Sequence, residues 1–533
     1  MSNISDELKE ILDFEQEKII SSNKKYIFVS ACPGSGKTYT VVKKIEKELS
    51  EIEQYQGIVA CSFTRESSEE LKSRINKKLE MNNSFIGTID SFVKDIVCKF
   101  VNRALINANL FSKQVIIDKK IFFPEEYVKI QDEFILKNNG RNLTINELTR
   151  YYDKNQSLKK IGNKYYSEWI KKLKECQYEV SFPTYLFATY IAKMRVFIEW
   201  FNNKYTTIYI DEAQDLNFFQ HLFFKTLKDN TNVNIIMVGD ANQSIYQFRG
   251  ARPELFRSLT NLGYNEYKIN VSIRCHPSII YYANKIYDSH LVKNYKDESH
   301  VNLISEINSS FLNGLTGSSF ILTESNNTAQ ELYELYKDDY DIIYTKKLDL
   351  DNKKYNDYYE NSDIIDELLR YYLNYDNVID KYKYPYEKIE SILLNCNTKI
   401  KQKDFNLSRK IQLNEFLKES CFKLGVIISD ETIFEIINKL EDEKYKYNYY
   451  TVEKENRIMT IHSSKGLESD NVIIVLDNRY NNINEEFKNK LFVAITRAKN
   501  KVYILSKNNE VVSNFINNLI VWALNFITNL IKN

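Results

Sequence analysis

The amino-acid sequence predicts an α/β fold in which parallel strands alternate with crossover helices. Short apolar runs rich in β-branched residues end in turn or charged residues, and several are followed by apolar residues at helical spacing. These runs cover residues 26–30, 57–62, 207–210, 234–238, 319–323, 471–476 and 501–505. Two longer stretches, about 95 to 200 and about 349 to 450, have 3.6-residue apolar spacing and few strand signals. We expect these stretches to be helical insertions.

The composition is that of an ordinary globular chain. Hydrophobic residues make up 43% and charged residues 27% of the 533 residues, which excludes a wholly disordered or collagen-like chain. Lys and Arg (73) nearly balance Asp and Glu (72), so a globally basic protein is excluded but a local basic groove is not. The seven cysteines form no C-x-x-C pair, which favours a reducing, cytoplasmic location. The apolar segment 519–531 is shorter than the roughly 20 residues of a membrane span, so we expect no membrane association.

A glycine-rich loop follows the first predicted strand. Residues 31–38 read Ala-Cys-Pro-Gly-Ser-Gly-Lys-Thr and precede a helical pattern, which is the Walker A pattern with alanine at the first glycine position. The backbone N–H groups of Gly34, Ser35 and Gly36 would close around phosphate oxygens. Lys37 would reach the β and γ phosphates, and Thr38 would hold a magnesium ion. An exposed lysine in a plain turn is the alternative, but the strand before and the helix after it favour a nucleotide site.

Two adjacent carboxylates end another predicted strand. Asp211 and Glu212 follow the apolar run 207–210. Carboxylates at this position are costly unless a cation or a proton transfer needs them. Asp211 suits a magnesium ion, and Glu212 suits polarisation of the attacking water. A solvated acidic turn is the alternative, which the upstream phosphate loop disfavours.

Together with other segments, these motifs resemble superfamily 1 DNA helicases of the UvrD/Rep type. Leu12 and Gln16 are similar to the Q motif of the family, in which the glutamine amide pairs with the adenine edge. Phe63 and Thr64 begin a segment similar to motif Ia, which touches single-stranded DNA. Thr88 lies in a segment similar to motif Ib. The resemblance therefore implies DNA contacts at Phe63, Thr64 and Thr88.

One position of motif Ib and one of motif IV depart from the family pattern. Asp90 stands where the family often has histidine, and a carboxylate there would repel a DNA phosphate. The segment 272–274 stands in the place of motif IV, where Arg274 matches an arginine finger. Ile273 replaces the tyrosine that stacks on adenine in the family. We therefore expect weaker selectivity for the adenine base.

The most specific match is the segment 238–251, which resembles motif III, while segment 211–215 resembles motif II. The resemblance implies that Gln243 senses the γ-phosphate and that Tyr246 and Phe248 stack on bases. Aromatic side chains bind single strands in this way without reading their sequence.

Two segments near the end of the chain complete the resemblance. Residues 459–468 are similar to motif V, with Glu468 at the ribose position and His462 near the DNA phosphates. Residues 492–498 are similar to motif VI, with Arg497 as a second arginine finger. Each residue alone has a structural explanation, but coincidence does not explain seven motifs in order.

The resemblance implies two RecA-like P-loop NTPase domains with parallel sheets, each carrying a mostly helical insertion, and ATP and Mg²⁺ as cofactors. Lys37, Asp211, Glu212, Gln243, Arg274 and Arg497 would be the catalytic residues. The expected domains are a first core (1–95 and 200–265) with its insertion (96–199), a second core (266–348 and 451–508) with its insertion (349–450), and a C-terminal helix (509–533).

We predict an ATP-dependent helicase or translocase that moves 3′ to 5′ on single-stranded DNA, the direction being implied by the resemblance alone. One alternative is a translocase that strips proteins from DNA and hardly unwinds it. Another is a helicase-like regulatory subunit of a Gabija-like phage-defence complex that acts with a partner nuclease; a repair protein is a further expected partner. An inactive ATPase scaffold is disfavoured, because the predicted catalytic residues are all present.

Overall fold

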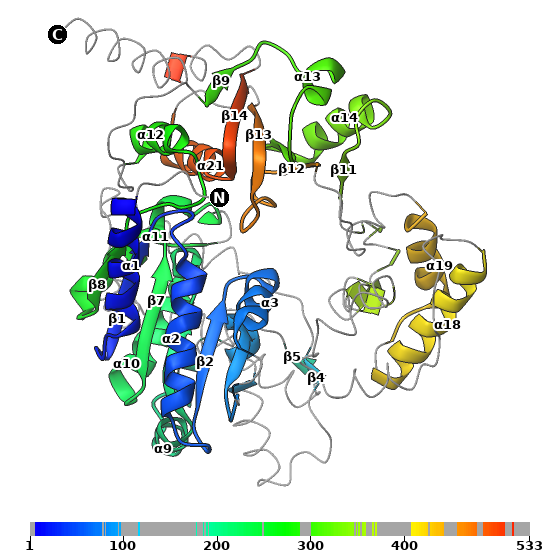
Figure 1. Cartoon of the computed structure of the whole chain (residues 1–533). Helices are drawn as coiled ribbons and strands as arrows, with labels where there is room; N and C mark the ends of the chain where they lie inside the picture. Colours follow the sequence, from blue (N-terminus) through cyan, green and yellow to red (C-terminus); the bar gives the residue numbers. More distant parts are fainter. Residues whose placement is uncertain are drawn as a thin grey trace, which may run out of the picture. The chain divides into compact units, whose positions relative to one another are not determined.

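The structure is a computed structural model of the whole chain (Figure 1). It describes residues 6–76, 79, 81–93, 95–96, 116–117, 177–178, 185, 188–189, 191–247, 250–287, 300–345, 348, 350–351, 354–355, 357–358, 365–366, 368–369, 372, 407–424, 427–441, 456–476, 483–506 and 514–515. The chain divides into two compact units. Unit 1 comprises Met1–Ser305 and Ile461–Asn533, and unit 2 comprises Glu306–Thr460.

The first sheet of unit 1 has six parallel strands in the order β3-β2-β6-β7-β1-β8. Its strands are β1 (Tyr26–Ala31), β2 (Gly57–Ser62), β3 (Phe85–Thr88), β6 (Tyr205–Ile210), β7 (Asn234–Gly239) and β8 (Asn265–Ile269). Because neighbouring strands are parallel, the chain must cross over between them even where they are consecutive, as in β2–β3 and β6–β7. The carboxyl ends of all six strands therefore lie at one edge, where ligands bind in open α/β sheets.

Side chains of this sheet alternate between two apolar cores. On one face, Ile27 and Val29 pack with α1 (Asp6–Ile20), α2 (Lys37–Glu51) and α3 (Arg65–Arg74). On the other face, Phe28 packs with aromatic side chains of α9 (Arg195–Lys204) and α10 (Phe218–Asn230). The two-residue period of a strand sends successive side chains to opposite faces, which accounts for this three-layer arrangement (Figure 1).

Unit 1 contains three further parallel strands, which form its second sheet. They are β9 (Val301–Leu303), β13 (Ser469–Leu476) and β14 (Ala498–Ser506), in the order β13-β14-β9. Helices α12 (Pro277–Ile286) and α21 (Glu485–Ile495) pack against each other and against these strands. The 3₁₀ helix Ala241–Gln243 of the first sheet also packs against α21. The C-terminal part of unit 1 is thus joined to the first sheet close to motif III.

Unit 2 contains three parallel strands and a helical core. The strands are β10 (Ser319–Thr323), β11 (Ile343–Tyr344) and β12 (Arg457–Thr460), in the order β11-β12-β10. Its short helices are α13 (Ser309–Asn313) and α14 (Asn326–Tyr336). Helices α18 (Leu407–Leu424) and α19 (Asp430–Lys439) share a separate apolar core.

The α/β prediction is confirmed, since all seven predicted runs are strands. Strands β3, β8, β9, β11 and β12 were not predicted from strand patterns. They are short, and β8 has the burial pattern of a largely exposed edge strand. Short exposed strands lack the apolar run on which the prediction relied.

Several predictions concern residues outside the described part of the chain. Most of the expected insertion 96–199 lies there, apart from short pieces that include the paired strands β4 (Ile116–Ile117) and β5 (Gln177–Tyr178). Most of the expected C-terminal helix 509–533 also lies there. The domain boundaries therefore stay predictions. Within the described residues, no helix combines the length and the apolar character needed to cross a bilayer.

Candidate functional site

The glycine-rich loop connects β1 to the first turn of α2. Gly34 (φ 72°) and Gly36 (φ 75°) both have left-handed backbone conformations, which glycine adopts without steric cost. A Cβ atom on Gly34 would lie 2.4 Å from the Cβ of Arg274. A Cβ atom on Gly36 would lie 2.8 Å from Nε2 of Gln16. Both glycines are therefore required by backbone conformation and by close packing.

Gln16 supports this loop from α1. Its side chain is buried, and Nε2 donates a hydrogen bond of 3.0 Å to the carbonyl oxygen of Ser35. The hydroxyl of Ser35 donates to the carbonyl oxygen of Cys32 at 2.7 Å. The predicted contact of Gln16 with the adenine edge stays a prediction; the contact present in the structure fixes the loop.

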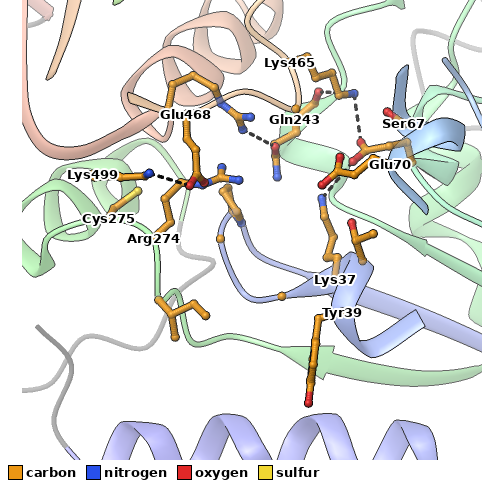
Figure 2. Close-up of a pocket in the computed structure, with 18 of the residues that line it drawn as sticks. Lys37, Tyr39, Ser67, Glu70, Gln243, Arg274, Cys275, Lys465, Glu468 and Lys499 are labelled. Carbon is orange, nitrogen blue, oxygen red and sulfur yellow. Dashed lines mark hydrogen bonds and ion pairs between the residues drawn. The ribbon is translucent and has the colours of Figure 1, made fainter. Parts of the chain in front are cut away.

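A cavity of about 520 Å³ lies beside the loop (Figure 2). All the residues predicted for the nucleotide site line this cavity except Gln16 and Ser35. They are Gly34, Gly36, Lys37, Thr38, Asp211, Glu212, Gln243, Arg274, Glu468 and Arg497. Residues more than 400 positions apart in the sequence thus meet in one cavity, all within unit 1.

The two adjacent carboxylates have opposite electrostatic surroundings. Burial and the neighbouring Glu212 raise the pKa of the buried Asp211 above its usual range. Burial opposes ionisation of Glu212, yet Lys37 and Lys465 together lower its pKa below the usual range. Lys37 Nζ lies 3.6 Å from Oε1 of Glu212, and Lys465 Nζ lies 3.3 Å from Oε2. Glu212 is thus an ionised carboxylate between two ammonium groups.

The backbone at Glu212 is unusual. Glu212 has φ 55° and ψ 38°, a left-handed conformation that few residues other than glycine adopt. Its N–H donates to Oδ1 of Asp211 at 2.9 Å, and Gln214 Nε2 donates to its Oε2 at 2.5 Å. Such strain persists where the surroundings fix it, and it clusters at functional sites.

The residues around the loop fit a magnesium ion. Thr38 and Asp211 line the same cavity and offer a hydroxyl and a carboxylate oxygen, which are the hard ligands that Mg²⁺ prefers. Burial and the charge of Glu212 raise the pKa of Asp211, and a bound cation would favour its ionised form. Among the described residues, no group of three or more His, Cys, Asp and Glu side chains could hold a metal by itself.

Arg274 reaches the cavity from the segment beside the phosphate loop. Its Nε donates to Oε2 of Glu468 at 2.6 Å, and Lys499 Nζ lies 3.0 Å from the other carboxylate oxygen of Glu468. The N–H of Ile273 donates to the carbonyl oxygen of Gly34 at 2.9 Å. Figure 2 shows Arg274, Glu468 and Lys499 converging at one side of the cavity. Arg274 is therefore attached to the loop by backbone contacts, and Glu468, predicted at the ribose, pairs with two cations.

Arg497 is the largest fully buried side chain of the described residues. Its Nη2 donates to Oε1 of Gln243 at 2.9 Å, and its Nε donates to the carbonyl oxygen of Val493 at 3.1 Å. Burial and the neighbouring Arg274 lower the pKa of Arg497. A nearby anion would relieve this unfavourable burial of positive charge. The predicted γ-phosphate sensor Gln243 and the predicted arginine finger Arg497 thus contact each other directly.

A stacked aromatic pair marks the predicted DNA side of the site. The rings of Phe63 and Tyr246 stack with centroids 5.3 Å apart and an interplanar angle of 30°. The ring of His462 lies 6.0 Å from that of Tyr246, and its Nε2 is 3.2 Å from the carbonyl oxygen of Ile245. Phe248, which was also predicted to stack on bases, lies outside the described residues.

Thr64 and Thr88 act as helix caps at the carboxyl ends of neighbouring strands. Thr64 follows β2 and accepts a hydrogen bond from Ser67 N–H at 3.2 Å. Thr88 ends β3 and accepts one from Ser91 N–H at 3.2 Å. Strands β2 and β3 are adjacent, so both caps lie at one edge of the sheet. Helix N-termini at such an edge favour phosphate oxygens.

Asp90, the residue that departs from the motif Ib pattern, is exposed to solvent next to this edge. The hydroxyl of Tyr185 donates to its Oδ1, and Gln220 Nε2 donates to Tyr185 at 3.0 Å. Tyr185 therefore links the carboxylate of Asp90 to α10. The repulsion of a DNA phosphate by Asp90 stays a prediction.

Two family models match the chain. The UvrD/REP helicase N-terminal domain matches residues 12–262, and the UvrD-like helicase C-terminal domain matches residues 456–505. The chain belongs to the UvrD/Rep-like helicases of superfamily 1. This family assignment agrees with the ordered motifs and with the two parallel sheets.

Individual relatives match this UvrD/Rep-like chain over different lengths. Gabija protein GajB of Bacillus cereus (strain VD045) is 28% identical over 93% of the chain and 95% of the relative. ATP-dependent DNA helicase Rep of Buchnera aphidicola subsp. Schizaphis graminum is 27% identical over 52% of the chain. ATP-dependent DNA helicase PcrA of Bacillus subtilis (strain 168) is 26% identical over 47% of the chain. The matches cover only 44% of that Rep and 36% of PcrA.

Sequence reasoning assigned no role to Lys465. The structure places its ammonium group in ion pairs with Glu212 and with the fully buried Asp215. Burial opposes the charge on Lys465, yet Asp215 and Glu212 raise its pKa above the usual range. Lys465 lies in the motif V segment, but the ion-pair partners are about 250 residues earlier. No local pattern in the sequence indicates such a pairing.

Proposed function

We propose that this UvrD/Rep-like chain hydrolyses ATP to move 3′ to 5′ along single-stranded DNA and to separate duplex strands. The observation that carries the proposal is the single cavity that holds Lys37, Glu212, Arg274 and Arg497. The first two residues belong to the first sheet and its phosphate loop, and the arginines belong to the segments that lead into the second sheet. Hydrolysis would then depend on contact between these two parts.

The residues of the cavity have complementary roles in this proposal. The loop N–H groups and Lys37 hold the phosphates, and Thr38 and Asp211 hold the magnesium ion, which neutralises phosphate charge when bound. Glu212 orients the attacking water and accepts its proton. Arg274 and Arg497 stabilise the charge that develops on the transferred group, and Gln243 positions Arg497 through their hydrogen bond.

Nucleotide state would set the relative position of the two parts. ATP binds tightly only when the arginines face the loop, so binding favours the closed arrangement and product release favours the open one. Phe63 of motif Ia and Tyr246 of motif III stack on each other, and in this proposal they would hold bases by stacking. Alternating contacts of this kind would move the strand.

An ATPase assay with and without single-stranded DNA tests the hydrolytic part. We expect strong stimulation of the wild type by DNA. Lys37→Ala should fall to background because the phosphates lose their cation, whereas Glu212→Gln should still bind ATP but not turn it over. Equal stimulation by RNA and DNA, or substantial turnover by Glu212→Gln, would contradict the proposal.

A strand-displacement assay tests the mechanical part. Duplexes with a 3′ or a 5′ single-stranded tail distinguish the direction of movement, and we expect unwinding only from the 3′ tail. DNA-stimulated ATPase without strand displacement would instead favour a translocase that strips proteins from DNA.

A second candidate is a helicase-like subunit of a phage-defence complex that acts with a nuclease. It is favoured by the match to Gabija protein GajB, which extends over nearly the whole of both chains, whereas the matched regions of Rep and PcrA are less than half of those proteins. A nuclease gene next to this one, and co-purification of the two products, would support this role. A cytoplasmic location fits both candidates, and the four cysteines in the described residues are free thiols.

A further inference from the structure

One buried lysine connects the catalytic carboxylate with the stacked aromatic pair. The Lys465 side chain is 9% exposed, and its Nζ lies 3.3 Å from Oε2 of Glu212. The same Nζ forms an ion pair with Asp215 and lies 5.2 Å from the centroid of the Tyr246 ring. Ammonium groups at this distance from an aromatic face are attracted by the ring quadrupole. A single side chain therefore contacts both the hydrolytic and the strand-binding parts of the site.

On the hydrolytic side, Lys465 restrains the carboxylate that must orient water. Oε2 of Glu212 faces both Lys465 Nζ and the amide of Gln214, which donates to it at 2.5 Å. A general base must itself come within about 2.6–3.2 Å of the group that it deprotonates. Lys37 also faces Glu212, but Lys37 would turn toward phosphates once nucleotide binds. Lys465 and Gln214 would then be the groups that still hold Glu212.

On the proposed DNA-binding side of the site, the two rings of the aromatic pair contact each other. Phe63 and Tyr246 are in direct stacking contact at 5.3 Å, a distance within the usual range of about 4.5–7 Å for two contacting rings. A nucleic-acid base can enter between these rings only if they separate. Separation that moves Tyr246 also changes the cation–π contact with Lys465. Binding of single-stranded DNA would thus affect Glu212 through two contacts, that of Tyr246 with Lys465 and that of Lys465 with Glu212.

We propose that Lys465 is a positioning residue that restrains Glu212 until a base of single-stranded DNA separates Tyr246 from Phe63. The inference rests on the proposed DNA-dependent ATPase and adds to it a physical route by which DNA stimulates hydrolysis. The competing explanation is that Lys465 only neutralises the buried Asp215. The two explanations differ in the turnover that each expects without DNA.

The test compares ATP turnover with and without a single-stranded oligonucleotide of deoxythymidine. Lys465→Met removes the charge and keeps most of the length of the side chain. A double variant, Lys465→Met with Asp215→Asn, also removes the buried carboxylate that the single variant leaves unpaired. We expect turnover without DNA to rise toward the DNA-stimulated level in both. The stimulation ratio should fall from the range of about 5- to 150-fold that is usual for coupled sites to about twofold or less.

A lysine that does not line the cavity provides the matched control. Lys490 pairs with Glu486 on α21, and Lys490→Met should leave both rates unchanged. A stimulation ratio that stays at the wild-type value in the double variant would overturn the proposal. So would a double variant that binds ATP but is inactive with and without DNA, because Lys465 would then assist catalysis. An unstimulated wild type would overturn the proposed function itself and is recognised before any variant is compared.

A double-mutant cycle tests the contact between Lys465 and Tyr246. Tyr246→Leu removes the aromatic face, and the proposal expects its effect on the stimulation ratio to disappear when Lys465 is already methionine. Independent effects of the two substitutions would refute the coupling, because residues that act through one contact are not additive.

Discussion

Gly34→Ala tests whether close packing of Gly34 against Arg274 sets the position of this arginine in the cavity. The new Cβ would lie 2.4 Å from the Cβ of Arg274, whereas ordinary contacts begin at 3.4 Å. The segment that bears Arg274 must therefore retreat by about 1 Å, a displacement that costs catalytic groups on the order of 10²-fold in rate. This factor corresponds to about 2.7 kcal/mol in the activation free energy.

The left-handed backbone at Gly34 adds a separate cost to folding, about 1–2 kcal/mol for a residue with a side chain. Gly263→Ala is the matched control, because Gly263 has a similar φ of 80° and a Cβ there would meet no atom within 4 Å. Denaturant unfolding should show a loss of stability for both variants and a larger one for Gly34→Ala, because only there does the new Cβ meet other atoms. DNA-stimulated ATP turnover should fall about 10²-fold only in Gly34→Ala. Equal turnover of the two variants would refute the reasoning.

Three further predictions concern DNA binding and the stability of the fold. Phe63→Ala should weaken binding of a labelled single strand, measured by fluorescence anisotropy, by about 1–3 kcal/mol, while the exposed Phe14→Ala should not. Asp90→Asn should tighten the same binding at low salt, since a negative charge near a phosphate is removed, and the gain should shrink at high salt. Asn217→Ala removes the capping box of α10 and should lower the free energy of unfolding by about 0.5–2 kcal/mol in a denaturant titration; no change would contradict the cap.

Local patterns were sufficient to predict the central strands and the phosphate loop. The run 57–62 is fully buried as β2, and the loop before Lys37 has the two left-handed glycines that phosphate binding requires. These features depend on residues that are close together in the chain. For the same reason, the edge strand β8, whose side chains are mostly exposed, gave no apolar signal.

Long-range pairings could not be predicted in the same way. Motif order placed Gln243 and Arg497 in one site, and they form a hydrogen bond across 254 residues. The link from Lys465 to Asp215 and Glu212 was not foreseen, because charged residues at a separation of about 250 positions carry no periodic signal. Packing also decided that Gln16 holds the loop through Ser35.

The central claim is that an arginine from the C-terminal part of unit 1 completes the hydrolytic site. Single-turnover ATP hydrolysis by Arg497→Lys on single-stranded DNA, measured beside equilibrium ATP binding, tests it most directly. Lysine keeps the charge but cannot reproduce the planar contacts of the guanidinium with Gln243 and Val493. We expect ATP binding to persist while the rate falls on the order of 10³-fold or more. Hydrolysis at the wild-type rate would contradict the claim.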